Sequence, residues 1–65
     1  MFMEEEMWIA RDRDGNLMLF RHKPSKVRFR GVWYGNISYM LPNYLFPEVK
    51  WSDEEPTKVK LVIEK

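Results

Sequence analysis

Glycine and proline residues divide this chain into pieces that are too short for a stable helix. Three glycines and four prolines are spread over its 65 residues. No piece between them carries apolar residues at helical spacing over the roughly 12–15 residues that a helix needs in water. Several pieces instead alternate apolar and polar side chains, which is the pattern of a half-buried strand. The sequence therefore predicts an all-β fold.

The predicted strands are short and follow one another closely. They cover residues 7–13, 17–20, 26–34 with a bulge at Gly31, 37–41 and 57–64. Antiparallel neighbours should dominate, because a parallel pair needs a crossover of about a dozen residues or more, and only residues 42–56 are long enough. We expect a small antiparallel meander of four to five strands, as a twisted sheet or a small barrel. Residues 42–46 lie between two prolines and are expected to form one short helical turn.

Alternation also predicts which side chains face the core. Residues 26–30 alternate basic and apolar side chains, so Val27 and Phe29 are expected to point inward. Residues 57–64 alternate in the same way, which places three apolar side chains on the core side: Val59, Leu61 and Ile63.

Two turns are predicted from glycine-containing pairs. Asp14-Gly15 marks a tight turn between the first two strands, and Gly35-Asn36 marks a second hairpin before the strand 37–41. A two-residue loop at Asp14-Gly15 pairs Ala10 with Leu19, and a longer loop shifts that register; the sequence leaves both open.

Both faces of the first hairpin are apolar. With the two-residue loop, one face carries Met7, Ile9, Met18 and Phe20, and the other carries Trp8, Ala10, Leu17 and Leu19. A single open sheet buries only one face against its own core. Either the chain wraps over both faces, for which residues 42–56 are suited, or one face is an interface.

Length and composition limit the class of protein. A chain of 65 residues forms one domain at most, here 1–65, and buries only about 60% of the surface that its unfolded form exposes. The absence of cysteine excludes disulfides and favours a reducing, cytoplasmic setting. The start Met1-Phe2-Met3 is followed by three glutamates, unlike a signal peptide, and no apolar run approaches the ~20 residues of a membrane span. We therefore expect a cytoplasmic protein with no membrane partner.

Residues 21–30 form the one basic cluster, with five cationic side chains and no acid: Arg21, Lys23, Lys26, Arg28 and Arg30. On one face, beside Trp33 or Tyr34, they could follow a nucleic-acid backbone and stack a base. The competing interpretation is that they only solvate the sheet or are neutralised by the acidic runs 4–6 and 53–55. The net charge of +1 favours this second interpretation.

No residue pattern points to catalysis. His22 is the only histidine and there is no cysteine, so a zinc site lacks ligands. The three glycines are isolated and form no phosphate loop, and the acidic runs lack the ligand spacing of a calcium loop. We expect no enzymatic activity, no cofactor and no metal site.

The aromatic and methionine side chains are the strongest hint of function. They are more numerous than one small core needs, and exposed aromatic and methionine patches mark partner sites. Core and interface remain equally open for the six candidate interface residues: Trp8, Met18, Phe20, Trp33, Tyr44 and Trp51.

Four segments together resemble a known family. They are Trp8-Ile9-Ala10-Arg11-Asp12, Asp14-Gly15, Leu45-Phe46-Pro47-Glu48-Val49-Lys50-Trp51 and Glu55-Pro56. They are similar to a family of short uncharacterised proteins from bacterial and phage genomes that share W-I-A-R-D-x-D-G and L-F-P-E-V-x-W. No activity is established for that family, so the resemblance transfers no site residue. It implies a small intracellular accessory protein of phage or mobile-element origin.

Two functions follow as expectations. The first is a non-enzymatic protein-interaction or accessory module, with self-association as one form of it and a homo-oligomer as the result. The alternative is a small nucleic-acid-binding β-module that uses the basic strand 21–30.

Overall fold

The computed structural model describes residues 2–64 and the side chains of residues 3–63, and strands make up more of it than any other element. In chain order the elements are β1 (Phe2–Arg11), β2 (Leu17–Phe20), β3 (Ser25–Val27), a 3-10 turn η1 (Arg28–Arg30), β4 (Val32–Tyr34), β5 (Ile37–Leu41) and β6 (Thr57–Glu64). Every strand pair is antiparallel. The all-β prediction is confirmed, and the predicted domain limits Met1 and Lys65 lie outside the described residues.

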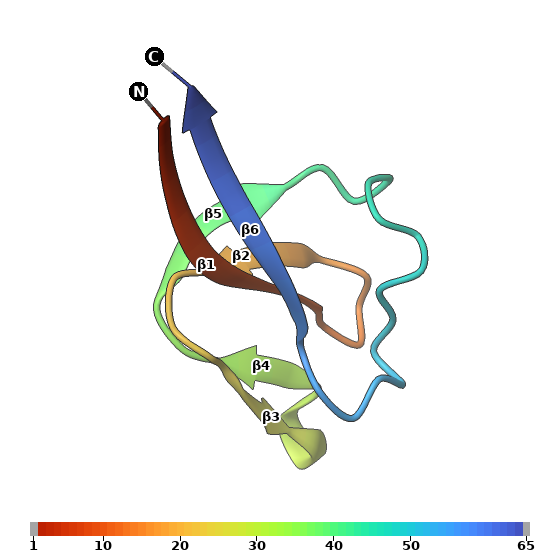
Figure 1. The fold of residues 1–65 in the computed structure, drawn as a ribbon. Coiled ribbons are helices and arrows are strands. Elements are labelled where there is room, and N and C mark those ends of the chain that lie inside the picture. The colour runs from red at the N-terminus through yellow and green to blue at the C-terminus, as the bar shows by residue number, and fades with distance from the viewer. Residues whose placement is uncertain (1, 65) are drawn as a thin grey trace.

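The strands form two separate sheets rather than one meander. β5, β2, β1 and β6 lie side by side in that order, and β3 pairs with β4 alone (Figure 1). The larger sheet is open, so the twisted sheet describes this fold and the closed barrel does not. Six strands are seen within residues 2–64, one more than the upper expectation, because the segment 26–34 folds back on itself.

The first hairpin has the longer of the two loops that the sequence left open. Ala10 lies opposite Met18 and Ile9 opposite Leu19, so Arg13, Asp14 and Gly15 form the loop. Gly15 adopts a φ of 100°, which suits a three-residue hairpin loop whose last residue has positive φ. The two faces expected for the shorter loop are therefore wrong, because this register places Ile9, Leu17 and Leu19 on one face and Ala10, Met18 and Phe20 on the other.

Gly35-Asn36 does not form the predicted hairpin between 32–34 and 37–41. β4 pairs with β3, so Tyr34 lies opposite Ser25, whereas β5 pairs with β2 in the other sheet. The Gly35-Asn36 pair is the point where the chain crosses between sheets. A turn signal identifies a change of direction, but it does not fix which strand the chain then joins.

The strand expected over 26–30 ends at Val27 and gives way to η1. Gly31 follows with a left-handed φ of 71°, a conformation that glycine adopts without a steric penalty. In this tight turn the side chain of Phe29 points outward and is 87% exposed. The prediction that Phe29 faces the core is therefore wrong.

Residues 42–53 contain turns in place of the predicted helical turn. Backbone hydrogen bonds join the N–H of Leu45 to the carbonyl of Pro42, Val49 to Phe46, and Asp53 to Lys50, over 2.9–3.1 Å. Each closes one four-residue turn and none continues into a helix. The single helical element within the described residues is η1.

The chain covers both faces of its first hairpin. On one face, here called the Trp33 face, Ala10, Met18, Phe20 and Trp33 form a buried cluster with Trp8 and Trp51 packed against it. On the other, here called the Val49 face, Ile9, Leu17 and Val49 are buried, with four partly buried neighbours: Leu19, Leu41, Leu45 and Val59. Chain wrapping thus buries this hairpin within one molecule.

The far half of β1 and β6 projects beyond this body as a two-stranded ribbon (Figure 1). β1 pairs with β2 only from Trp8 onward, while its pairing with β6 begins at Phe2. The molecule is accordingly elongated, 43 Å by 22 Å by 17 Å. Leu61 and Ile63 lie on this ribbon and are 42% and 43% exposed, so the prediction that they face the core is wrong. Val59, nearer the body, is partly buried as expected.

Candidate functional site

An apolar hollow opens on the Val49 face, between the sheet and the loop that follows β5. Its volume is about 220 Å³. The residues that line it are Met7, Ile9, Leu19, Leu41, Phe46, Val59, Lys60 and Leu61. Apart from Lys60 these side chains are apolar, so the hollow suits an apolar group and offers little to a polar ligand.

The exposed apolar surface continues from this hollow along the ribbon. Strand alternation places Met3, Leu61 and Ile63 on the same side of the sheet as Val59, and Met3 lies directly opposite Ile63. All three are substantially exposed. We call this exposed surface the apolar face; it comprises Met3, Tyr39, Leu41, Phe46, Val59, Leu61 and Ile63. Glu5 is the one acidic side chain among the ribbon residues of this face, and it forms an ion pair with Arg21 at 3.5 Å.

The opposite side of the ribbon is charged. Lys58 pairs with Glu6 at 2.8 Å and Lys60 with Glu4 at 3.2 Å, both diagonally across the two strands. The hydrogen bond and the charge of Lys58 lower the pKa of Glu6. The ribbon is therefore amphipathic, and the side that would ordinarily face a core is the uncovered one.

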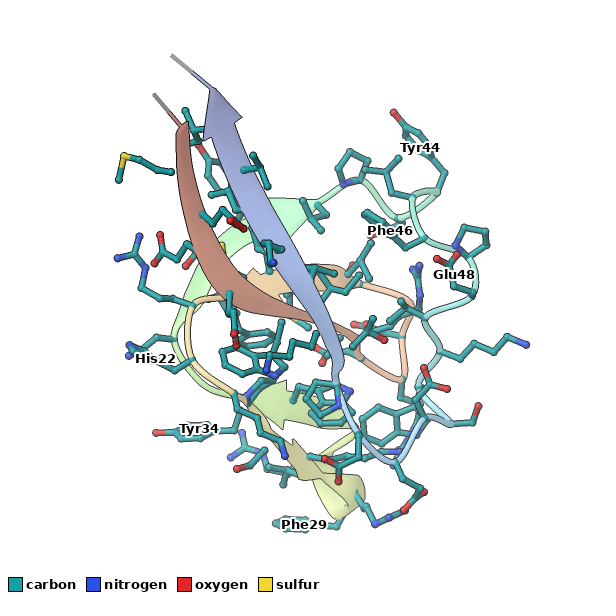
Figure 2. All side chains as sticks on the ribbon, viewed as in Figure 1. His22, Phe29, Tyr34, Tyr44, Phe46 and Glu48 are labelled. Atoms are coloured by element: carbon teal, nitrogen blue, oxygen red, sulfur yellow. The ribbon has the colours of Figure 1, made fainter. Side chains whose placement is uncertain are left out.

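Phe46 holds an unusual backbone conformation at the edge of the hollow. Its φ is 50°, in the left-handed region that costs a bulky residue about 1–3 kcal/mol. Its ring points toward the sheet, whereas the neighbouring Tyr44 points away from it (Figure 2). Strain of this kind persists only where surrounding contacts impose it, and it concentrates at functional positions.

Arg11 supplies those contacts. Its guanidinium donates to the carbonyl oxygens of five residues, at distances of 2.7–3.2 Å: Val49, Gly15, Asn43, Leu45 and Phe46. The planar fork of arginine carries five N–H donors and is suited to several fixed acceptors at once. Arg11 therefore holds the loop 43–49 against the end of β1 and fixes the position of Phe46.

Asp12 ties the smaller sheet to the larger one. Its Oδ1 accepts a hydrogen bond from the Trp33 backbone N–H at 2.8 Å, and the Trp33 indole N–H donates to the Arg11 carbonyl at 3.0 Å. Burial raises the pKa of Asp12, the Trp33 hydrogen bond opposes that rise, and the nearby charge of Asp14 adds to it. A buried carboxylate with one strong donor acts as a structural acceptor here.

Lys26 and Arg13 hold the acidic loop near Trp51. Lys26 Nζ donates to the carbonyls of Trp51 and Asp53 at 2.6 and 2.9 Å, and lies 4.4 Å from the centre of the Trp51 ring. Arg13 lies over the same ring at 5.5 Å, and Trp33 meets it edge to face. Lys26 is therefore occupied within the fold.

The remaining members of the basic cluster are on the surface, and most are paired with acids. Lys23 pairs with Glu55 at 2.9 Å, Arg28 pairs with Glu54, and Arg21 pairs with Glu5 as described above. The hydrogen bond and the charge of Arg28 lower the pKa of Glu54. Arg30 makes no ion pair with any described side chain. The acidic runs thus neutralise most of this cluster.

Two exposed aromatic rings stand beside these basic residues. Phe29 in η1 and Tyr34 in β4 are 87% and 74% exposed, and both point away from the body of the molecule (Figure 2). Tyr34 was considered beside the cluster from the sequence, whereas Phe29 was assigned to the core.

The six candidate interface residues divide into three groups. Met18, Phe20 and Trp33 are buried core residues, and Trp8 and Trp51 pack against them as partly buried neighbours. Only Tyr44 is well exposed, and it points away from the apolar face. The fold of the single chain therefore removes Met18, Phe20 and Trp33 from its surface. Several exposed apolar residues lie instead on the ribbon, among them Leu61 and Ile63, which the sequence assigned to the core.

The Arg11 and Asp12 contacts were not anticipated from the sequence. A signal was available: the charged pair Arg11-Asp12 ends an apolar strand, and its segment and residues 45–51 are two for which a family resemblance was hypothesised. Those two segments are the ones that Arg11 joins.

Comparison with protein-family models, with curated proteins and with solved structures finds no match. None of the described residues forms a helix of the length and apolar character that crossing a membrane requires. Within the same residues, no three histidine, aspartate or glutamate side chains gather closely enough to hold a metal ion.

Proposed function

We propose that this chain is a non-enzymatic protein-interaction module that acts as a small cytoplasmic accessory protein and binds its partner through the apolar face. The observation that carries the proposal is the amphipathic ribbon, whose charged side is internally paired and whose apolar side has no cover within the described residues. The resemblance to short bacterial and phage proteins supports an origin in a phage or mobile element.

The physical argument concerns continuity. Single exposed apolar residues are normal on any protein, but contiguous patches bordered by polar residues mark interaction sites. Here the hollow and the ribbon residues Met3, Leu61 and Ile63 form one surface, and the strained Phe46 stands at its rim. A partner that buries this surface gains free energy at about 25 cal/mol per Å² of apolar area removed from water.

The test compares two neighbouring aromatic residues. Phe46→Asn removes the ring from the hollow while keeping a residue type that tolerates positive φ, and Tyr44→Asn removes a ring that points away. Tagged wild type and both variants are used to capture partners from host cells that also express an untagged copy. We expect Phe46→Asn to lose the bound partner, whether the untagged copy or another protein, and Tyr44→Asn to retain it. Equal capture by all three proteins would contradict the proposal.

A second candidate function is weak binding of single-stranded nucleic acid at η1. The observation that favours it is the pair of exposed rings, Phe29 and Tyr34, beside Arg28 and Arg30, since aromatic rings with nearby cations stack bases. The ion pairs of Arg28 and Lys23 weaken this candidate, because phosphates would have to displace Glu54 and Glu55.

A further inference from the structure

We infer that the partner is a second copy of this chain, joined by antiparallel pairing of two β6 strands with Leu61 on the two-fold axis. This inference rests on the proposed function, because the second copy joins along the β6 edge of the same apolar face and extends that face. Four observations carry it: the open edge of β6, the two-stranded ribbon, the composition of the other edges, and the charges along β6.

β6 is a long, regular edge strand. It pairs with β1 on one side only, without a shift of register from Thr57 to Glu64. Its outer backbone N–H and C=O groups therefore have no strand partner among the described residues. Its sequence, TKVKLVIE, contains no proline or glycine, and an exposed, regular edge strand with one apolar side is a template for pairing with another chain.

The ribbon also lacks the number of strands that gives independent stability. From Met7 towards the N-terminus, the sheet consists of β1 and β6 alone. A two-stranded ribbon has marginal stability in water unless further strands or a packed layer support it. Pairing β6 with β6 of a second copy turns this region into four strands. Each exposed side chain of β6 then gains neighbours on the side where it has none.

The other free edges are less suitable. The outer edge of the ribbon along β1 carries Glu4, Glu5 and Glu6, so two such edges would bring like charges together. The opposite edge of the sheet, β5, is short, is followed by Pro42, and has an irregular register with β2. The open edge of β6 is the one that is long, regular and not acidic.

The charges of β6 select one register. In a two-fold antiparallel pair, opposite residues are equally far from the axis and share a face. If Lys60 lies on the axis, its ammonium group faces Lys60 of the second copy. If Val59 lies on the axis, Lys58 faces Lys60 of the second copy. Both arrangements bring like charges together and are repulsive. Placing Val62 there shortens the paired segment to 60–64.

Leu61 on the axis avoids these penalties. Leu61 then meets Leu61 of the second copy, Val59 meets Ile63, and the stem of Lys60 covers Val62. The paired segment covers 58–64. Because Val59 and Leu61 also line the hollow, the two hollows lie on one continuous apolar surface, and the two sheets become a single sheet of twice the strand number.

The test uses the absence of cysteine from the chain, which makes every introduced thiol unique. Four single variants are oxidised under identical conditions: Leu61→Cys, Lys60→Cys, Val62→Cys and, as a control for random collision, Tyr44→Cys. Directly opposite residues have Cβ atoms about 4.5–5.5 Å apart, within reach of a disulfide after small adjustments. We expect Leu61→Cys to dimerise several-fold faster than the other three. An equimolar mixture of Lys60→Cys and Val62→Cys should form the mixed dimer in preference to either homodimer.

Sedimentation of the unmodified chain across a wide concentration range separates the outcomes. Concentration-dependent dimers together with the Leu61 pattern support the inference. Dimers that cross-link fastest at another position, or at none of the four, overturn the β6 geometry. A strictly monomeric chain at high concentration overturns the second copy as partner, and the proposed function still stands if Phe46→Asn loses a different captured protein. It falls as well if Phe46→Asn changes nothing.

Discussion

The Nε of Arg11 donates a hydrogen bond to the carbonyl oxygen of Val49 at 2.7 Å, although 38 residues separate them in the chain. The same guanidinium reaches the carbonyls of Leu45 and Phe46. One side chain thus supplies hydrogen-bond donors to the carbonyl groups of an irregular loop. Among the described residues, no neighbouring strand or helix supplies backbone donors to these carbonyls. The loop in turn covers the Val49 face with Val49 and Leu45 and positions Phe46.

We expect Arg11→Lys to destabilise the fold strongly. A lysine ammonium has three donors on a flexible stem and cannot replace the fork of five, so the free energy of unfolding should fall by about 2–3 kcal/mol, the scale of lost hydrogen bonds to a charged group. Urea denaturation measures this loss. Arg21→Lys is the matched control, because Arg21 makes one exposed ion pair, and its substitution should change stability by less than about 1 kcal/mol.

Asp12 gives a prediction with a defined dependence on pH. Asp12→Ala leaves the Trp33 N–H without its acceptor and should cost about 1–3 kcal/mol, whereas Asp12→Asn keeps an oxygen acceptor and removes the buried charge. Because burial raises the pKa of Asp12 in the folded state, the charge penalty is fully present above that raised pKa and disappears below the unfolded value. We therefore expect Asp12→Asn to be more stable than wild type near neutral pH. The difference should shrink as the pH falls through the raised pKa. An Asn variant as unstable as the Ala variant near neutral pH would contradict this role.

Local pattern predicted where β2, β5 and β6 lie, but it did not predict the first half of β1, the 3-10 turn within 26–34, or which strands pair. The β6 strand and the antiparallel all-β class follow from alternation and from short pieces between glycines and prolines, whereas the sequence did not decide between an open sheet and a closed barrel. Register did not follow, because a loop of two or three residues at Asp14-Gly15 is equally compatible with the sequence, and one residue of shift exchanges the faces. The crossing at Gly35-Asn36 depends on which sheet has an open edge, which is a long-range property.

The candidate site was harder to predict for a related reason. Strict alternation in β6 indicates one buried face, but burial requires a layer to cover it, and residues 2–64 provide no layer over the ribbon. Leu61 and Ile63 therefore fit the sequence pattern of buried residues, although both side chains are exposed. Met18 and Phe20 were candidates for an interface because both faces of the hairpin are apolar, and the wrapping segments that bury them are irregular and leave no periodic signal.

The contrast between Ile9 and Leu61 gives a third prediction. Ile9 is buried in the Val49 cluster, so Ile9→Ala should lower the free energy of unfolding by about 2–5 kcal/mol at any protein concentration. Leu61→Ala removes a half-exposed side chain and should cost less than about 1 kcal/mol in dilute protein. At concentrations where dimers form, its cost should grow, because association stabilises the folded state by mass action. Thermal melts at several concentrations test this, and a Leu61→Ala penalty that is large and independent of concentration would show that Leu61 belongs to the monomer core.

The last prediction concerns the exposed residues of η1 and the neighbouring Tyr34, here called the tip of the smaller sheet. If the η1 region binds single-stranded nucleic acid, the contact is mainly electrostatic, because Phe29 and Tyr34 offer only two rings. Replacing Arg28 and Arg30 together by Gln should then weaken binding and flatten the logarithmic salt dependence by about one to two. Glu54→Gln should strengthen binding, because it releases Arg28 from its ion pair. Lowering the pH through the depressed pKa of Glu54 should also strengthen binding, because protonated Glu54 no longer pairs with Arg28. Fluorescence anisotropy of a labelled oligonucleotide at several salt concentrations measures all three effects. Binding that is unchanged by the double substitution and by Glu54→Gln would show that this tip does not contact nucleic acid.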